Sequence, residues 1–377
     1  MQIKGPLNFG SLLVLVIGFM TTNPSIASAC DVPVFRYALE RWPAEMFQVI
    51  IFHRGPLSAS ERKIAESLRR SSASELPYVN HTFTAVDLDH EADPRLSALW
   101  ESLENPPLPR LVLRRPVGRI ADQVVWSGRL SSENADVVVD SPVRQKMADQ
   151  VLDGNSAVWL LLESGREDAD DEAAGLIEAE LTRLEKALKL PEAVSADSPA
   201  GVDPLRVKFS LIRLSRLDPA EQVLIALLMR TEPDLVLYES HPLAFPVYGR
   251  ARALYALVGD GINPGNIEEA CRFLVGPCAC EVKWLNPGMD LLTSTDWESG
   301  LVGSWVDQVG LASLTDWEKP EWALGMTAGD NQAVAEKSVM LSRPIKRSFL
   351  LSLGLVVGLI VLVSLAVAIR AKGKRRR

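Results

Sequence analysis

Three of the four cysteines lie close together in the C-terminal half of the chain, as Cys271, Cys278 and Cys280. Gly276-Pro277 breaks the helix predicted to carry Cys271, so the chain turns back toward it. In an oxidising compartment we expect one structural disulfide among these three cysteines. Two other interpretations stay open. One is a reducible Cys278–Cys280 pair, because so small a ring is strained. The other is a soft-metal site, for example for Cu(I).

A second group of polar side chains follows a predicted strand and comprises Asp87, Asp89, His90, Glu91 and Asp93. Such a group can bind a metal, but acidic residues at the start of a helix more commonly cap it. The chain has no phosphate-binding loop, dinucleotide fingerprint, nucleophile elbow or HExxH motif. We therefore predict no metal, no cofactor and no conventional catalytic residue. Cys278 and Cys280 remain the alternative catalytic pair.

The N-terminus has the features of a secretory signal. Lys4 precedes the apolar run 11–20, and Ala27-Ser28-Ala29 gives a small-residue cleavage site. We expect residues 1–29 to be removed, which leaves Cys30 at the mature N-terminus. Cys30 is then lipidated, free, or the partner of the odd thiol.

The C-terminus predicts a membrane anchor. Residues 348–369 form an uncharged apolar stretch of the length that spans a bilayer. Residues 370–377 are mostly basic, and the positive-inside rule places them in the cytoplasm. Both ends predict a single-pass protein of the cell membrane with its N-terminus outside and its bulk in the periplasm. If the source is eukaryotic, the alternative is the endoplasmic reticulum membrane.

The charge balance limits the partners. The chain has 40 basic and 48 acidic residues, a net charge of −8. Because the acidic residues all lie between the two predicted terminal segments, the exterior is more acidic than the whole chain. This argues against nucleic acid and against electrostatic binding to anionic lipid.

The mature exterior alternates strands and helices in two similar halves. The first half, 30–154, contains predicted strands at 48–52, 83–88, 110–113 and 123–126, and helices at 58–70, 94–101 and 142–152. The second half, 155–283, contains predicted strands at 157–162, 206–214 and 254–258, a further strand that Pro246 precedes, and helices at 170–190, 219–230 and 266–274. Residues 284–347 are expected to form a Trp-containing juxtamembrane segment and stalk.

The order of these elements, with Asp87-Leu88-Asp89 and a proline before the third strand, resembles the thioredoxin fold. The resemblance implies an α/β architecture of two tandem thioredoxin-like domains, each a mixed sheet with flanking helices, followed by one transmembrane helix. It also implies that Pro109 and Pro246 occupy the position of the family's cis-proline.

Thioredoxin-like redox enzymes carry Cys-x-x-Cys after the first strand. This chain has His53-Arg54-Gly55-Pro56 and Glu163-Ser164-Gly165-Arg166 at those places, without a thiol. The chain is similar to bacterial envelope proteins of this fold, a resemblance that implies no particular activity.

We therefore expect a non-catalytic binding or assembly protein of the cell envelope, with a protein partner there. The alternative is a thiol-disulfide redox protein or a metal-handling protein acting through Cys278 and Cys280.

Overall fold

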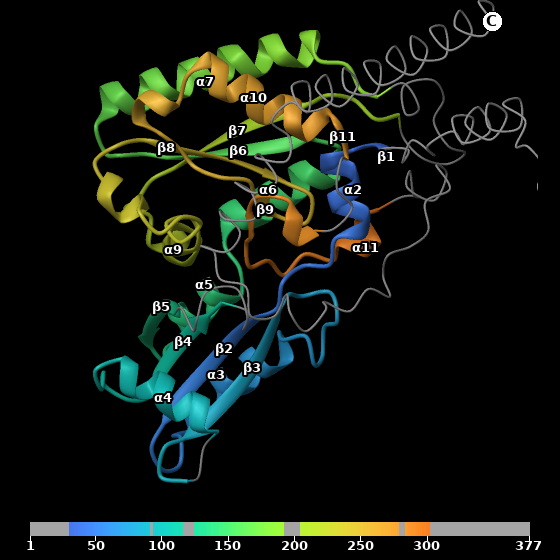
Figure 1. Cartoon of the computed structure of the whole chain (residues 1–377). Coiled ribbons are helices and arrows are strands. Elements are labelled where there is room, and N and C mark those ends of the chain that lie inside the picture. The colour runs from blue at the N-terminus through green and yellow to red at the C-terminus, as the bar shows by residue number, and fades with distance from the viewer. Residues whose placement is uncertain (1–29, 91–92, 116–123, 192–203, 279–282, 302–377) are drawn as a thin grey trace, which may run out of the picture. The chain divides into compact units, whose positions relative to one another are not determined.

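The computed structural model describes residues 30–90, 93–115, 124–191, 204–278 and 283–301. The predicted signal peptide, stalk, membrane helix and basic tail lie outside these ranges, as does Cys280. Within the described ranges, no helix has both the length and the apolar character needed to cross a membrane. The described part is a mixed α/β structure with two mixed sheets flanked by helices (Figure 1).

The first sheet has four strands in the order β3-β2-β4-β5. Strand β2 pairs parallel with β3 and antiparallel with β4, and β4 pairs antiparallel with β5. The bounds are β2 (Phe47–His53), β3 (His81–Asp87), β4 (Arg110–Arg114) and β5 (Val124–Arg129). Strand β2 is central because its apolar run is buried on both faces.

Helices α3 (Ala59–Arg70), α4 (Pro94–Ser102) and α5 (Ser132–Val139) flank this sheet. Helix α6 (Pro142–Leu152), which the sequence assigns to the first half of the chain, packs instead against the strands of the second sheet. Helix α3 begins at the predicted capping box, in which Ser58 and Glu61 each bond the other's backbone amide. The side chains of Val49 and Ile51 join the core that includes α3, α5 and α6. Those of Ile50 and Phe52 point to the other face and pack with α4.

The second sheet repeats this strand order as β7-β6-β8-β9, with β12 added beside β9 and β10 paired with β8. Strands β6 and β7 are parallel, and the β6–β8 and β8–β9 pairs are antiparallel. The bounds are β6 (Ala157–Leu162), β7 (Phe209–Leu214), β8 (Leu243–Tyr248), β9 (Arg252–Ala253), β10 (Leu257–Val258) and β12 (Met289–Asp290). The single strand predicted at 254–258 is thus replaced by two short ones.

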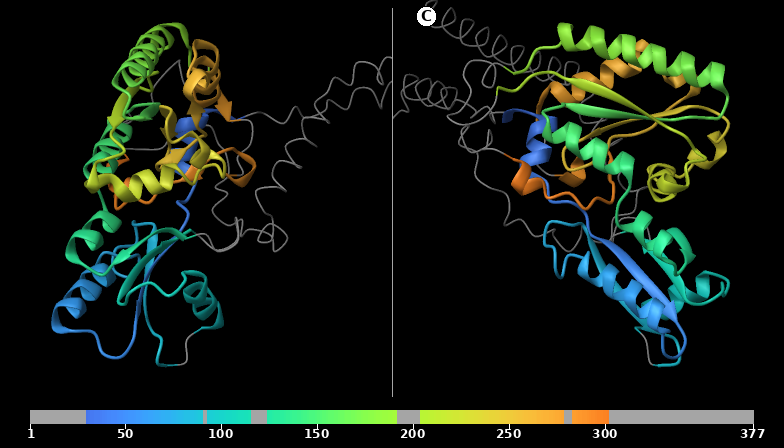
Figure 2. Two further views of the ribbon diagram at one scale, coloured as in Figure 1. Left: turned by 90° about the vertical axis from the view of Figure 1, so that its left-hand side faces the viewer. Right: turned by 180° about the vertical axis from the view of Figure 1, so that it is seen from behind.

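Helices α7 (Glu167–Ala187) and α10 (Pro264–Val275) lie side by side on one face of this sheet (Figures 1 and 2). Helix α9 (Gln222–Leu228) packs with the other face. Strand β6 shows why both faces are covered. Trp159 and Leu161 belong to the α7 and α10 side, whereas Leu160 and Leu162 belong to the α9 side. The short helices are η1 (Pro219–Glu221), η2 (Leu235–Tyr238), η3 (Gly259–Gly261), η4 (Lys283–Leu285) and α11 (Trp297–Gly300).

The first residues that the structure describes pack with the second sheet. Strand β1 (Cys30–Pro33) pairs antiparallel with β11 (Pro277–Cys278), the segment that follows α10. Helix α2 (Val34–Arg41) buries Phe35 and Tyr37 in the core shared with α7 and α10. The polypeptide therefore contributes to the second sheet's core before it enters the first sheet at β2.

Candidate functional site

Three chain segments meet at one end of the first sheet, where β2 and β3 end and β4 begins. His53 pairs with Asp87 in the parallel register. Because Phe52 pairs with Arg110, the preceding Pro109 stands next to His53 in the same row. The Leu108–Pro109 peptide bond is cis, at the position where the sequence predicted a cis-proline.

The loop after β2 is closed by the carboxylate of Asp87. The backbone N–H of Gly55 donates to Oδ1 of Asp87 at 3.0 Å, and that of Asp89 donates to the same oxygen at 3.1 Å. Nδ1 of His90 lies 3.1 Å from the other oxygen. The hydrogen bond from Asp89, followed by those from Gly55 and His90, lowers the pKa of Asp87. The loop's polar groups are thus bonded to one another, and no nucleophile lies among them.

The second sheet closes its corresponding loop with a different acid. Asp170, in the first turn of α7, is buried and accepts from the backbone N–H of Ser164 at 2.7 Å and of Gly165 at 2.9 Å. The hydroxyl of Ser164 donates to the same carboxylate at 2.8 Å. Gly55 and Gly165 both have positive φ, at 64° and 85°, which glycine adopts without steric cost. Both loops therefore have a positive-φ glycine and a carboxylate that accepts from their backbone N–H groups, and neither contains a thiol.

Pro246 does not have the position that the sequence predicted for it. It lies inside β8, where it pairs with Trp159, and Leu108–Pro109 is the single cis peptide bond in the part of the chain that the structure describes. The residue that corresponds to Pro109 is Pro242, which immediately precedes β8. The carbonyl oxygens of the two prolines also accept hydrogen bonds at corresponding places in the two sheets. The carbonyl of Pro109 accepts from Leu130 at 3.1 Å, and that of Pro242 accepts from Gly259 at 3.0 Å.

The predicted cysteine cluster is only partly described. Cys271 lies on α10 as a buried free cysteine, so the structure lacks the disulfide that the sequence predicted for this residue. Cys271 lies on the face of α10 that packs in the core with α7 and β6. Burial raises the pKa of this thiol to about 12, against a smaller opposite effect of Trp159. Cys278 is described in its backbone, as part of β11.

The acidic group after β3 serves local structure. Asp87 closes the loop described above, and Asp93 caps α4 by accepting from the backbone N–H of Arg95 at 2.8 Å. Among the described residues, no group of three or more His, Cys, Asp or Glu side chains is placed to hold a metal ion.

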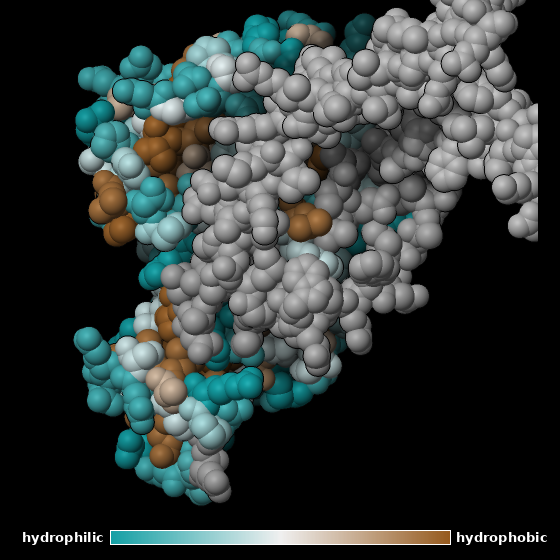
Figure 3. Space-filling view, viewed as in Figure 1, coloured by the Kyte–Doolittle hydropathy of each residue, from teal (hydrophilic) through white to brown (hydrophobic). Residues whose placement is uncertain are grey.

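Exposed apolar side chains lie on two segments near the corresponding end of the second sheet. Leu217 is 90% exposed just after β7, and Val236 and Leu237 are 61% and 75% exposed on η2, which precedes β8. Arg216 connects these segments, because its guanidinium donates to the carbonyl of His241 at 3.1 Å. Figure 3 shows brown surface at its left edge, where Figure 1 draws the yellow segment between α9 and β8. We call Leu217, Val236 and Leu237 the apolar patch.

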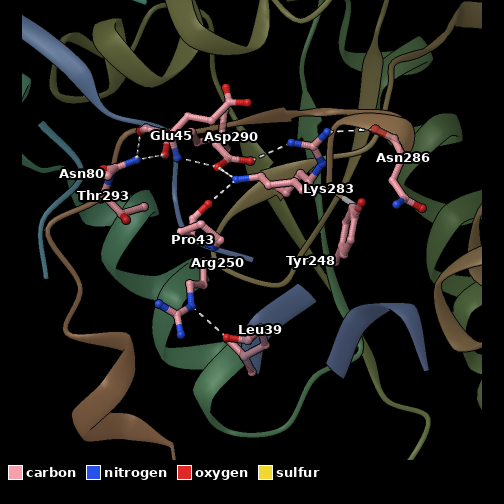
Figure 4. A network of polar contacts seen from close by, with 12 residues as sticks. Leu39, Pro43, Glu45, Asn80, Tyr248, Arg250, Lys283, Asn286, Asp290 and Thr293 are labelled. Carbon is pink, nitrogen blue, oxygen red and sulfur yellow. Dashed lines mark hydrogen bonds and ion pairs between the residues drawn. The ribbon is translucent and has the colours of Figure 1, made fainter. Parts of the chain in front are cut away.

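A buried ionic network, which the sequence did not suggest, centres on Asp290 of β12 (Figure 4). Asp290 accepts from Nη1 of Arg252 at 2.8 Å, from the backbone N–H of Glu45 at 2.8 Å, and from Lys283. Burial opposes its charged form, but Lys283 and Arg252 outweigh this and lower the pKa of Asp290 to about 2.

Buried Asn80 links this network to the first sheet. Its side-chain amide donates to the carbonyls of Glu45 at 3.2 Å and Leu291 at 3.0 Å, and its oxygen accepts from the backbone N–H of Thr293 at 2.8 Å. Figure 4 shows Asn80 beside Glu45 and Thr293. The contacts cross-link three distant chain segments, so this network is structural. No short motif signals it, because its members are far apart in sequence.

No protein-family model matches the chain, and no curated protein sequence matches it closely enough to count as a relative.

Proposed function

We propose that the chain is a membrane-anchored extracytoplasmic protein that serves in binding or assembly in the cell envelope. Its two sheets act as thioredoxin-like scaffolds without thiol catalysis. The orders β3-β2-β4-β5 and β7-β6-β8-β9, with one parallel and two antiparallel pairs each, favour the thioredoxin-like interpretation. The predicted signal peptide and apolar C-terminal stretch favour the location.

The main support for a non-catalytic role is the set of residues in the two loops, which contain no thiol. Dithiol exchange needs a thiolate at the start of the first helix, where its pKa is lowered. Here the carboxylates of Asp87 and Asp170 accept hydrogen bonds from the backbone N–H groups of the two loops. The thiol of Cys271, with its pKa raised to about 12, is the opposite of an activated nucleophile.

The apolar patch is the surface that we propose for binding. In a soluble domain, apolar side chains exposed to this degree on adjacent segments are typical of interaction sites. The patch lies at the end of the second sheet, close to the loop that corresponds to the first sheet's cis-proline. We propose that it binds an apolar segment of a partner envelope protein.

A photo-crosslinking amino acid at position 237 tests this surface in cells. We expect one discrete adduct. The same photo-crosslinking amino acid at position 285, where Leu285 is exposed but lies outside the patch, should not give this adduct. With the crosslinker at position 217, the double variant Val236→Asp/Leu237→Asp should reduce that adduct at least about tenfold, because a charge inside an apolar contact costs more than about 1.4 kcal/mol. Equal adducts from positions 237 and 285 would contradict the proposal.

A second experiment separates binding from thiol catalysis. The purified full chain in detergent is incubated with a peptide disulfide and with glutathione, and turnover is measured. We expect no turnover above that of glutathione alone. Turnover that Cys280→Ser abolishes would instead establish the redox alternative at Cys278 and Cys280.

A further inference from the structure

The mature N-terminus and the end of α10 form a two-stranded sheet that places two cysteines opposite each other. In the antiparallel pair of β1 and β11, Cys30 is the partner of Cys278 and Pro33 is the partner of Pro277, with an irregularity in β1 between the two pairs. The backbone N–H of Val34 donates to the carbonyl of Gly276 at 3.0 Å at the end of this pair. Figure 1 draws β1 beside β11.

The two helices that adjoin these strands hold β1 and β11 together. Helix α2 follows β1 directly, and α10 directly precedes β11. Phe35 of α2 and Leu274 of α10 belong to the same buried core. Apolar packing therefore supports the Pro33–Pro277 end of the pair, in addition to the hydrogen bond there, and the chain continues from it to Cys30 opposite Cys278.

Directly opposed residues of an antiparallel pair have Cα atoms about 4.5–5.5 Å apart, and their side chains leave the same face of the pair. A disulfide needs Cα atoms about 4.4–6.8 Å apart. From this register we infer that Cys30 and Cys278 form a disulfide that fastens the mature N-terminus to the second sheet. Buried Cys271 does not compete for either partner, because it lies inside the core on α10.

The bond forms by exchange with an oxidised disulfide donor. The two thiols lose two protons and two electrons, one sulfur–sulfur bond forms, and the donor's disulfide is reduced to two thiols. In cells this step rests on the proposed extracytoplasmic location, where such donors are available. In the test tube, oxidised glutathione is sufficient.

The pairing changes the assignment of every cysteine. A sulfur held in this bond cannot carry a lipid, so the N-terminal cysteine is not a lipidation site. Cys278 is no longer available to pair with Cys280, which leaves Cys280 as the odd thiol. The redox and metal alternatives, which both need Cys278 and Cys280 together, lose one of their two thiols.

Peptide mapping of the full chain tests the bond. Protein purified in detergent is reduced, reoxidised with oxidised glutathione, alkylated and digested with trypsin without reduction. Trypsin releases Cys278 and Cys280 in one peptide, 273–283, and Cys30 in a peptide that ends at Arg36. We expect these two peptides to be linked. The linkage should persist in Cys280→Ser and disappear in Cys278→Ser.

Several results would overturn the inference. They are an internal Cys278–Cys280 bond in the wild-type protein, a link between Cys271 and the peptide 273–283, and a linkage that Cys280→Ser removes and Cys278→Ser keeps. A lipid on Cys30 in protein isolated from cells would also overturn it. The location is judged separately: a link that forms in the test tube while both thiols are free in cells supports the pairing and contradicts the extracytoplasmic proposal.

Discussion

His81 is a buried histidine whose two ring nitrogens have no hydrogen-bond partner among the residues that the structure describes. Burial, with a smaller contribution from the nearby charge of Arg144, lowers the pKa of His81 to about 4. The folded protein therefore holds this ring neutral, whereas the unfolded chain protonates it below about pH 6.5. The free energy of unfolding should fall as the pH drops from about 6.5 to 4.

The first prediction isolates this residue. The loss should approach about 3 kcal/mol at pH 4, since each pKa unit corresponds to about 1.4 kcal/mol. His81→Leu should remove that part of the pH dependence, with little effect at pH 7 because no hydrogen bond is lost. Urea unfolding at several pH values measures it. The exposed His241→Leu variant is the control, and an unchanged pH slope in His81→Leu would contradict the explanation.

The second prediction concerns the accessibility of Cys271. With a pKa of about 12, its thiolate is a fraction of about 1 in 10,000 at pH 8, and its side chain is buried. Iodoacetamide should therefore label Cys271 in urea and leave it unlabelled in the folded protein. Mass spectrometry of the peptide 253–272 reads out the labelling. Rapid labelling under native conditions would show that α10 opens, and would restore Cys271 as a candidate for exchange.

At the scale of the elements, the buried ionic network joins the segment before β2, the strand β9 and the strand β12. Removing one partner leaves the others buried and charged, which costs more than the pair contributes. Asp290 is the partner common to Arg252 and Lys283, so it is the critical residue.

The third prediction follows from this geometry. Asp290→Asn should lower the free energy of unfolding by about 3–5 kcal/mol, because Arg252 and Lys283 lose their buried counter-charge. Asp171→Asn removes an ion pair with Arg213 that is largely exposed, so it should cost at most about 1 kcal/mol. Denaturant titration compares the two variants. Equal losses would show that the network is solvated and weak.

Elements with a strong local signal could be predicted from the sequence. Strand β6 is a continuous apolar run, helix α6 begins at a proline that fits the first helical turn, and the Ser58 capping box fixes the start of α3. Their bounds depend on nearby residues alone.

Elements that depend on distant partners were missed. Helix α2 is stabilised by packing on the second sheet, and β12 forms only because β9 is beside it. The prediction for Pro246 failed for a related reason. Both Pro242 and Pro246 are followed by apolar residues, and only the pairing of Pro246 with Trp159 shows that Pro246 is inside the strand. The apolar patch could not be predicted from the sequence either, because valine and leucine are usually buried and only the structure shows that Val236 and Leu237 are exposed.

At the scale of the whole chain, orientation in the membrane is the fourth prediction. Protease added to intact spheroplasts should digest the chain up to the predicted stalk and spare residues 349–377, because the signal peptide and the basic tail predict the same orientation. Immunoblotting with tags at both ends reads out the result. A protected N-terminal half would place it in the cytoplasm.

The fifth prediction concerns cooperativity. The sequence predicts two domains with a boundary at residue 154, but one continuous core includes Val49 of the first sheet, Met147 of α6 and Val158 of the second sheet. Trp126 of β5 also donates to the side chain of Gln222 of α9 at 3.2 Å. Elements that share a core unfold together. Calorimetry of a fragment that covers residues 30–301 should therefore give one transition whose calorimetric and van't Hoff enthalpies agree.

Matched variants test whether that transition belongs to both sheets. Val49→Ala and Val158→Ala each remove two methyl groups from the shared core, so each should cost about 2 kcal/mol and lower the same melting temperature by several degrees. If the sheets were independent, each substitution would shift only part of the heat absorption and leave the rest in place. That outcome would favour the boundary at residue 154, and would mean that the shared core packs two domains that fold separately.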